Sequence, residues 1–349
     1  MSRKRTARSF QNFVSVCRCS RLSVSFHKTG GASAYPNPKT SFSFVSALGF
    51  HYLCTLRRTL DALDAPKKDI KQKFVAASLP VRTAVGAVYV ALLVGCILGG
   101  ATPYFVFMAL ASGVCIAEFI RLLSLRSRSL QVSLVVIHVL LLLSVAFSTE
   151  YLPVRGFEAR WDVLLLPLLF LLFLVELLRA KDNAVADLGR AFLIFIYITM
   201  PFVLALLIPY TGAVSMYDYR LPLGLFILTW VCDTFAYLCG ISMGRHKLME
   251  RVSPKKTLEG FVGGVVFTLV GGYVLSRVFP QTLTLTQWMV VAAIVCVMGV
   301  GGDLVESMFK RMAGVKDSGR IMPGHGGMLD RLDSFIMSVP FVYAYLYLS

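Results

Sequence analysis

Apolar and polar stretches alternate along the chain from about residue 81 to its end. A helix that crosses a bilayer needs about 20 mostly apolar residues, and nine stretches approach that length. They cover residues 82–100, 103–123, 130–149, 161–179, 191–210, 221–241, 260–279, 286–302 and 334–348. The pattern therefore predicts an all-α, polytopic transmembrane protein with about nine spans.

Composition supports the membrane class. The 349 residues are 56% hydrophobic and 15% charged, whereas soluble domains are about 45–50% apolar and about 25% charged. The eight cysteines form no Cys-x-x-Cys pair, so neither a disulfide framework nor a zinc site is indicated. We interpret the cysteines as small buried apolar residues.

The N-terminal region differs from the rest. Residues 1–80 hold 14 Lys/Arg and 3 Asp/Glu, which is most of the net charge of +16, and residues 1–60 contain no acid. This composition fits an organellar transit peptide, a disordered basic tail, or an upstream start codon that adds residues without a folded role. We divide the chain into a basic extension, residues 1–75, and a transmembrane domain, residues 76–349.

The charges between the apolar stretches predict an orientation, because cytoplasmic loops are rich in Lys and Arg. Basic residues concentrate in every second loop. They are Arg121, Arg126 and Arg128; Arg179, Lys181 and Arg190; Arg245, Lys247, Arg251, Lys255 and Lys256; and Lys310, Arg311, Lys316, Arg320 and Arg331. The alternation places the N-terminus and the last two basic loops in the cytoplasm. It also explains the basic residues without nucleic-acid binding.

Acidic residues that are candidates for catalysis or metal binding cluster near the C-terminus. Asp303 and Glu306 are three residues apart, as are Asp330 and Asp333, and this spacing places each pair on one face of a helix. Crowded carboxylates repel one another, and a divalent cation such as Mg²⁺ would relieve the repulsion. The pattern therefore indicates metal-dependent phosphoryl or nucleotidyl transfer.

Basic and glycine residues between these acids fit phosphate recognition. Lys and Arg side chains pair with phosphate oxygens, and glycines let backbone N–H groups approach an anion. The candidates are Lys310, Arg311, Lys316, Gly326, Gly327 and Arg331, together with Ser253, Lys255 and Lys256 in the preceding basic loop. Asp233 lies inside an apolar span and is a functional candidate on that ground. His325 fits a substrate or proton role as well as a structural one.

The segment from Ser307 to Asp333 resembles the C-terminal motif of the phosphatidate cytidylyltransferase family. That motif runs Ser-x-apolar-Lys-Arg, four residues, Lys-Asp-x-small, two residues, apolar-Pro-x-His-Gly-Gly-apolar-x-Asp-Arg-apolar-Asp. Its spacing is unbroken here, with Met322 in place of a more usual Leu, Ile or Phe. The resemblance extends upstream to the segments 233–245 and 253–257, and to the membrane region by hydropathy.

The resemblance implies a Mg²⁺-dependent reaction in which phosphatidate and CTP give CDP-diacylglycerol and pyrophosphate. It assigns Asp303, Asp330, Asp333 and Asp233 to the metal. We take the first three, together with Lys310 and His325, as the candidate catalytic residues. The phosphate contacts are assigned to Ser253, Lys255, Lys256, Lys310 and Arg311. It also allows an additional monovalent cation and a homodimer. The expected location is a bacterial inner membrane with a cytoplasmic active site, or an organellar membrane if residues 1–60 are a transit peptide.

Two other functions fit parts of the pattern. A lipid kinase that uses CTP would need similar metal and phosphate chemistry, but the His-Gly-Gly-x-x-Asp-Arg-x-Asp ending argues against it. An ion-coupled transporter would explain an acid inside a span, but transporters commonly show two similar halves. No internal repeat is visible, so the cytidylyltransferase interpretation is favoured.

Overall fold

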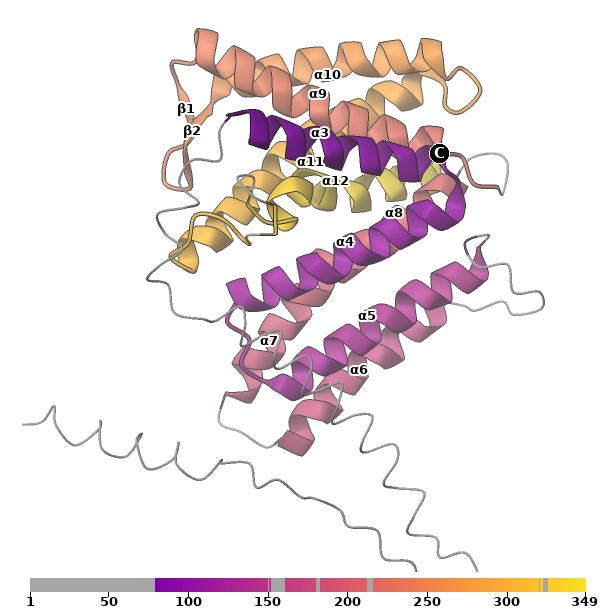
Figure 1. Cartoon of the computed structure of the whole chain (residues 1–349), viewed down its shortest axis with the longest axis vertical. Coiled ribbons are helices and arrows are strands. Elements are labelled where there is room, and N and C mark those ends of the chain that lie inside the picture. The colour runs from indigo at the N-terminus through magenta and orange to yellow at the C-terminus, as the bar shows by residue number, and fades with distance from the viewer. Residues whose placement is uncertain are drawn as a thin grey trace, which may run out of the picture. The chain divides into compact units, whose positions relative to one another are not determined.

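The computed structural model describes residues 79–149, 151, 161–179, 183–211, 216–319, 321–322 and 326–349. The predicted extension over residues 1–75, its three interpretations and His325 therefore lie outside the described residues. The described part is mostly helical (Figure 1). Its helices are α3 (Leu79–Leu98), α4 (Ala101–Leu122), α5 (Arg128–Ser148), α6 (Trp161–Arg179), α7 (Ala184–Ile194), α8 (Met200–Leu207), α9 (Arg220–Met243), α10 (Leu258–Val278), α11 (Leu285–Met312) and α12 (Leu329–Leu348).

Six helical segments in the described ranges are long and apolar enough to cross a membrane. They are Ala101–Leu122, Arg128–Ser148, Ala184–Tyr210, Arg220–Met243, Leu258–Val278 and Leu285–Met312. The third segment joins α7 and α8 through a π-helical turn, Phe195–Thr199, and ends in a 3₁₀ turn, Ile208–Tyr210. Each of the nine predicted spans overlaps a helix, whereas the count of nine and the cytoplasmic N-terminus stay predictions.

Two helices differ from the predicted boundaries where the polar residues begin. The predicted span 286–302 is part of α11, which continues to Met312, and the predicted span 334–348 is part of α12, which begins at Leu329. The candidate residues from Asp303 to Arg311 are therefore helical and do not lie in a loop. The reason is that Glu, Met, Lys and Arg favour helix nearly as well as apolar residues, so the helix outlasts the apolar pattern.

The prediction of an all-α fold also misses a small sheet between α9 and α10. Strands β1 (Lys247–Met249) and β2 (Ser253–Thr257) pair antiparallel, with Lys247 opposite Thr257. The strands are too short and too polar to show an apolar alternation. Pro254 is compatible with a sheet that has two edge strands.

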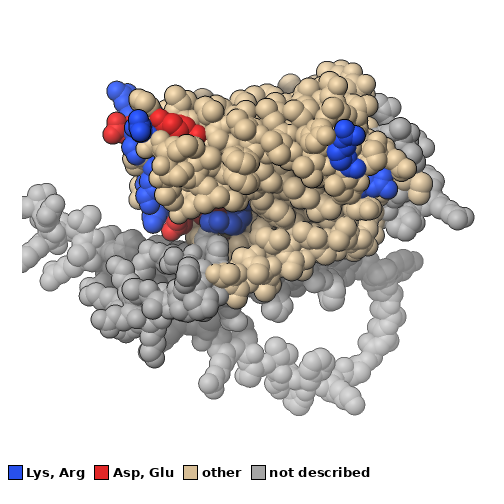
Figure 2. All heavy atoms as spheres, turned by 90° about the horizontal axis from the view of Figure 1, so that it is seen from above, with Lys and Arg blue, Asp and Glu red and all other residues tan. Residues whose placement is uncertain are grey.

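The helices pack in neighbouring pairs that are visible in Figure 1. α9 lies along α10, α11 along α12 and α5 along α6, while α10 also packs on α11. The buried core includes Tyr104 and Phe119 on α4, Phe202 on α8 and Trp288 on α11. On the face drawn in Figure 2, charged side chains gather at two ends with an uncharged surface between them. This distribution fits a protein whose middle contacts lipid.

Gly302 sets the closest approach of α11 to α12. A Cβ atom at this position would lie 2.5 Å from the carbonyl oxygen of Asp333 and 2.7 Å from Cβ of Met337. At the preceding residue, Gly301, a Cβ would meet nothing within 4 Å. Because small residues let membrane helices approach closely, the crossing depends on the missing side chain at 302.

Gly302→Ala is expected to lower the free energy of unfolding by about 1–3 kcal/mol, because the added methyl group must push the two helices apart. Gly301→Ala is the matched control on the same helix. It is expected to be neutral or slightly stabilising, because alanine favours helix over glycine. The measurement is the thermal unfolding midpoint of each detergent-purified variant, and equal midpoints would contradict the packing argument.

Candidate active site

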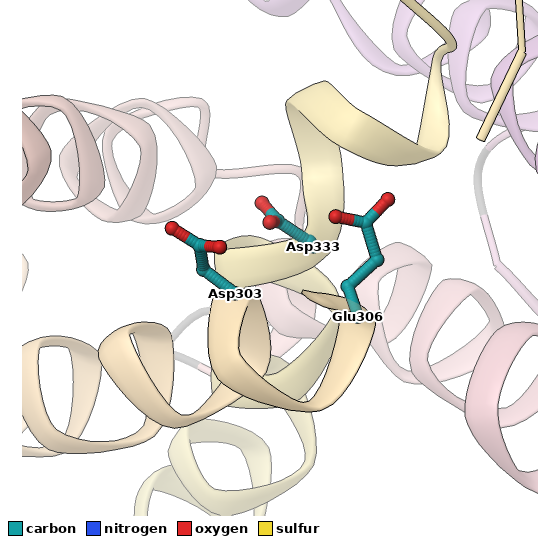
Figure 3. A group of neighbouring side chains, drawn as sticks. All are labelled: Asp303, Glu306 and Asp333. Atoms are coloured by element: carbon teal, nitrogen blue, oxygen red, sulfur yellow. The ribbon is translucent and has the colours of Figure 1, made fainter. Parts of the chain in front are cut away.

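Three carboxylates meet where α11 crosses α12. Asp303 and Glu306 lie one turn apart on α11, and Asp333 comes from the second turn of α12. One oxygen of each lies within 4.8 Å of the others, and the three side chains point toward one another (Figure 3). Glu306 is fully buried and Asp333 is 8% exposed, whereas the side chain of Asp303 is 39% exposed. The carboxylate cluster, as we call these three residues, is therefore open on the Asp303 side.

Two lysines from distant parts of the chain contact this cluster. Lys310 Nζ donates to Glu306 Oε2 at 2.5 Å and to Asp330 Oδ1 at 2.8 Å. Lys256 Nζ, on β2, lies 2.9 Å from Asp303 Oδ2. The predicted phosphate-binding segment around Ser253–Thr257 and the predicted acidic segment are therefore neighbours in the fold, although they are far apart in the sequence.

The residues of the cluster fit a divalent metal ion. Glu306 Oε1 is buried and has no hydrogen-bond partner among the described residues, although a buried acceptor normally needs one. Three carboxylates close together also repel one another in a buried setting. Carboxylate oxygens are hard ligands of the kind that Mg²⁺ prefers. A cation held by Asp303, Glu306 and Asp333 would satisfy the unpaired oxygen and relieve the repulsion.

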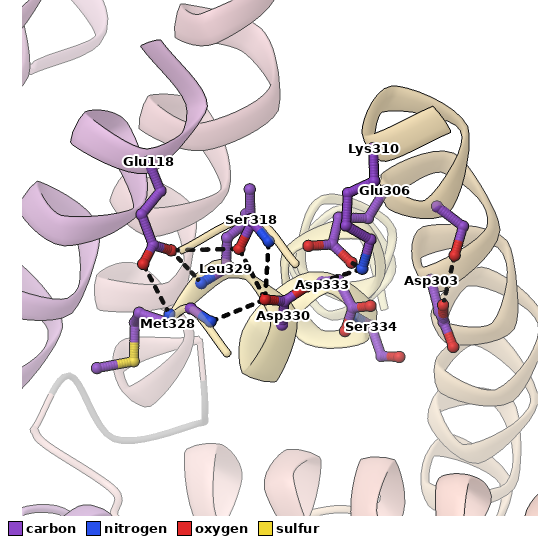
Figure 4. Close-up of polar contacts among 12 residues, drawn as sticks. Glu118, Asp303, Glu306, Lys310, Ser318, Met328, Leu329, Asp330, Asp333 and Ser334 are labelled. Carbon is purple, nitrogen blue, oxygen red and sulfur yellow. Dashed lines mark hydrogen bonds and ion pairs between the residues drawn. The ribbon is translucent and has the colours of Figure 1, made fainter. Parts of the chain in front are cut away.

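Asp330, which the family resemblance assigns to the metal, has a different environment. Its Oδ1 accepts from Lys310, and its Oδ2 accepts from Ser318 N and Oγ at 3.0 Å each and from Gly327 N at 2.8 Å. Burial opposes its ionisation, but the hydrogen bonds from Lys310 and Gly327 hold the pKa of Asp330 below its ordinary value. Asp330 therefore anchors the segment around Ser318 and Gly327 to the start of α12 (Figure 4).

Asp233 lies on α9, outside the 4.8 Å group. It interacts electrostatically with Asp303, Lys256 and Arg331, so it adds negative charge beside the cluster. Its side chain is exposed at the surface of the described structure. The structure therefore brings Asp233 near the candidate metal ligands without including it among them.

The remaining predicted phosphate contacts fall into two groups. Lys255, Arg311, Lys316 and Arg331 are exposed, and Ser253 is partly buried at the start of β2. Side chains alternate along a strand, so Lys255 points away from the side on which Lys256 meets Asp303. Gly326 has a positive φ of 88°, and the N–H of Gly327 is donated to Asp330. In the described structure, the anion that approaches Gly327 is therefore a carboxylate of the protein.

Sequence reasoning did not assign Glu306 to the metal or single out Glu118. Glu118 lies on α4 and is 1% exposed. Its carboxylate accepts from the N–H groups of Met328 and Leu329 at the start of α12. The signal that could have found it is the one used for Asp233, an ionisable residue inside an apolar span.

Known proteins resemble part of this chain. Phosphatidate cytidylyltransferase of Staphylococcus saprophyticus is 45% identical over 140 residues, which cover 38% of this chain and 54% of that protein. The proteins of the same name from Staphylococcus haemolyticus and Staphylococcus aureus are each 49% identical, over 115 and 117 residues. In both cases the match covers 33% of this chain and 44% of the relative. The chain spans about half the length of the curated relatives it matches.

The wider match is to a family. The sequence model of the cytidylyltransferase family matches residues 80–349, which include every described helix except the first residue of α3. The matched region contains the carboxylate cluster and both lysines that contact it. The chain therefore belongs to the cytidylyltransferase family.

Proposed function

We propose that this protein transfers the cytidylyl group of CTP to phosphatidate, giving CDP-diacylglycerol and pyrophosphate. The observation that carries the proposal is the carboxylate cluster flanked by Lys256 and Lys310, in a chain of the cytidylyltransferase family. The proteins named phosphatidate cytidylyltransferase among its relatives support the choice of substrates.

In the proposed reaction, an oxygen of the phosphatidate phosphate forms a bond to the α-phosphorus of CTP. The bond from that phosphorus to the oxygen bridging to the β-phosphate breaks, and pyrophosphate leaves with the electron pair. No covalent enzyme intermediate is needed. The contribution of the protein is therefore positioning and charge stabilisation, as in other phosphoryl transfers.

Asp303, Glu306 and Asp333 would hold Mg²⁺, and Asp330 would keep the neighbouring loop in place. When bound there, Mg²⁺ would neutralise negative charge on the phosphate oxygens. Lys256 lies at the more exposed edge of the cluster, beside Asp303, so its ammonium group can turn to a phosphate of CTP. Ser253, Lys255, Arg311, Lys316 and Arg331 would extend this phosphate-binding surface, and His325 would contact substrate.

The setting of the site suits a lipid substrate. The cluster lies toward the polar end of α11, a helix long and apolar enough to span a membrane. A phosphate at the membrane surface could reach such a position while its acyl chains stay in the bilayer. We extend the proposal to nine spans, a cytoplasmic N-terminus and active site, a bacterial inner membrane, and a homodimer that can bind a monovalent cation as well.

The test uses the full chain, purified in detergent and supplied with phosphatidate and CTP carrying ³²P at the α or the γ position. A cytidylyltransferase places the α label in the lipid and the γ label in pyrophosphate. We expect that outcome with Mg²⁺, none with EDTA, and a roughly 10²-fold lower rate for Asp303→Asn. A γ label in the lipid would identify a kinase instead, and no turnover by folded protein would favour a transporter.

A further inference from the structure

Glu118 links a membrane helix near the beginning of the described chain to the active-site segment near its end. Its Oε1 accepts from Met328 N at 3.2 Å, and its Oε2 accepts from Leu329 N at 2.9 Å. The Ser318 hydroxyl lies 3.4 Å from Oε2. Figure 4 shows the carboxylate pointing from α4 into the turn before α12. More than 200 residues separate the partners, so these bonds depend on the tertiary fold.

The Glu118 carboxylate supplies the capping acceptor that the N-terminus of α12 lacks. The first N–H groups of a helix have no partner within the helix and need a capping acceptor. Met328, at the N-cap position, provides no side-chain cap. Glu118 takes that role from another helix, and its negative charge is favourable at a helix N-terminus. The position of the first turn of α12 therefore depends on α4.

The surrounding segment is shaped around this carboxylate. A Cβ atom added at Gly319 would overlap the Glu118 carboxylate, and one added at Gly327 would lie 2.5 Å from Oε2 and 2.7 Å from Oε1. Both glycines belong to the motif that the sequence analysis singled out. The close approach of Glu118, and at Gly327 also of the Ser318 hydroxyl, leaves no room for a side chain at either position.

The same contacts lead to both functional acids of α12. Asp330 directly follows Leu329, and Asp333 lies one turn further along the helix. The Ser318 hydroxyl lies within hydrogen-bonding distance of both Glu118 and Asp330, but its one proton can serve only one of them at a time. A shift of Glu118 would therefore disturb Asp330 through Ser318 and Asp333 through the helix.

We infer that Glu118 is a positioning residue for the proposed reaction: by capping α12 it holds Asp333 in the carboxylate cluster. The inference rests on the proposed function for its kinetic consequence. The part of the inference that concerns metal binding, namely that Glu118 sets the metal affinity of the cluster, does not depend on which substrates are used. In the described structure, the hydrogen bonds of Glu118 go to Ser318, Met328 and Leu329 and not to the carboxylate cluster.

The test compares Glu118→Gln and Glu118→Ala with Glu176→Gln. Glu176 is also a buried glutamate, but it pairs with Arg179 on α6, so it controls for the loss of a buried carboxylate elsewhere. Two properties are measured for the wild type and each variant. The first is the rise of the unfolding midpoint with Mg²⁺ concentration, and the second is the kcat and KM for CTP in the proposed reaction. Substituting a residue that orients metal ligands typically costs roughly 10–100-fold in affinity or activity.

We expect Glu118→Gln to raise the Mg²⁺ concentration for half-maximal stabilisation by roughly 10-fold and to lower kcat more than it changes KM for CTP. Glu118→Ala should have the larger effect, because glutamine keeps one acceptor oxygen. Glu176→Gln should leave the half-maximal Mg²⁺ concentration unchanged. If the Glu118 variants lose stability but keep the wild-type Mg²⁺ dependence, the residue is merely structural and the inference is wrong.

Gly319→Ala provides an independent variant, because it displaces the carboxylate while leaving Glu118 in the chain. It should raise the half-maximal Mg²⁺ concentration in the same direction, and it decides the matter if the Glu118 variants do not fold. A wild-type response of the midpoint to Mg²⁺ without CDP-diacylglycerol formation would refute the proposed function alone. If the wild type forms CDP-diacylglycerol, and the Glu118 and Gly319 variants keep its kcat and its half-maximal Mg²⁺ concentration, the positioning role alone is refuted.

Discussion

Asp333→Asn is expected to lower the rate of CDP-diacylglycerol formation by roughly 10²–10³-fold, the usual effect of removing one preorganised electrostatic group. Asp333 is buried beside Asp303 and Glu306, and asparagine cannot supply its charge to a metal. The hydrogen bond that Asp333 Oδ1 accepts from Ser334 N can be kept by asparagine. The measurement is the initial rate at saturating CTP and phosphatidate.

The same variant should not lose stability in EDTA. Removing one of three crowded carboxylates relieves repulsion, so the unfolding midpoint should stay the same or rise, while its increase with Mg²⁺ should disappear. Asp218→Asn is the matched control, since Asp218 contacts Arg220 and Thr282 away from the cluster. Full activity of Asp333→Asn, or a midpoint that still rises with Mg²⁺, would rule out the assigned role.

Lys310→Met is expected to lower the free energy of unfolding by about 3–5 kcal/mol, because it leaves two buried carboxylates without their cation. The Lys310 side chain is 13% exposed, and its partners Glu306 and Asp330 are 0% and 6% exposed. Activity should be lost as well, since Glu306 and Asp330 would lose the ammonium group that joins them. The measurement is the unfolding midpoint in detergent, with Lys247→Met, an exposed lysine on β1, as the control.

A second substitution separates the charge effect from a packing effect. In Glu306→Gln/Lys310→Met, only Asp330 remains unpaired, and the loss of stability should be smaller than in Lys310→Met. Activity should remain low, because the double variant lacks a carboxylate of the cluster. If the double variant is as unstable as Lys310→Met, the lysine stabilises the fold through packing and not through its charge.

The sequence predicted the positions of the helices better than their ends. Apolar runs are a local property, so the interval 103–123 and the helix Ala101–Leu122 nearly coincide. The end of α11 and the start of α12 were misplaced because hydropathy falls where the polar site begins, whereas helical hydrogen bonding continues. The short sheet formed by β1 and β2 has no apolar pattern of its own and was not predicted.

The sequence by itself determined the membrane class, the family and the set of side chains available for chemistry, because these follow from composition, hydropathy and an unbroken motif. Only the tertiary structure decided which of these side chains form the carboxylate cluster and which hold neighbouring segments in place. The crossing of α11 and α12 at Gly302 groups Glu306 with Asp303 and Asp333, while Lys310 and the backbone around Ser318 engage Asp330. Glu118 reaches α12 from α4. The physical reason is that the partner of a carboxylate depends on distances between helices remote in sequence, which no local pattern encodes.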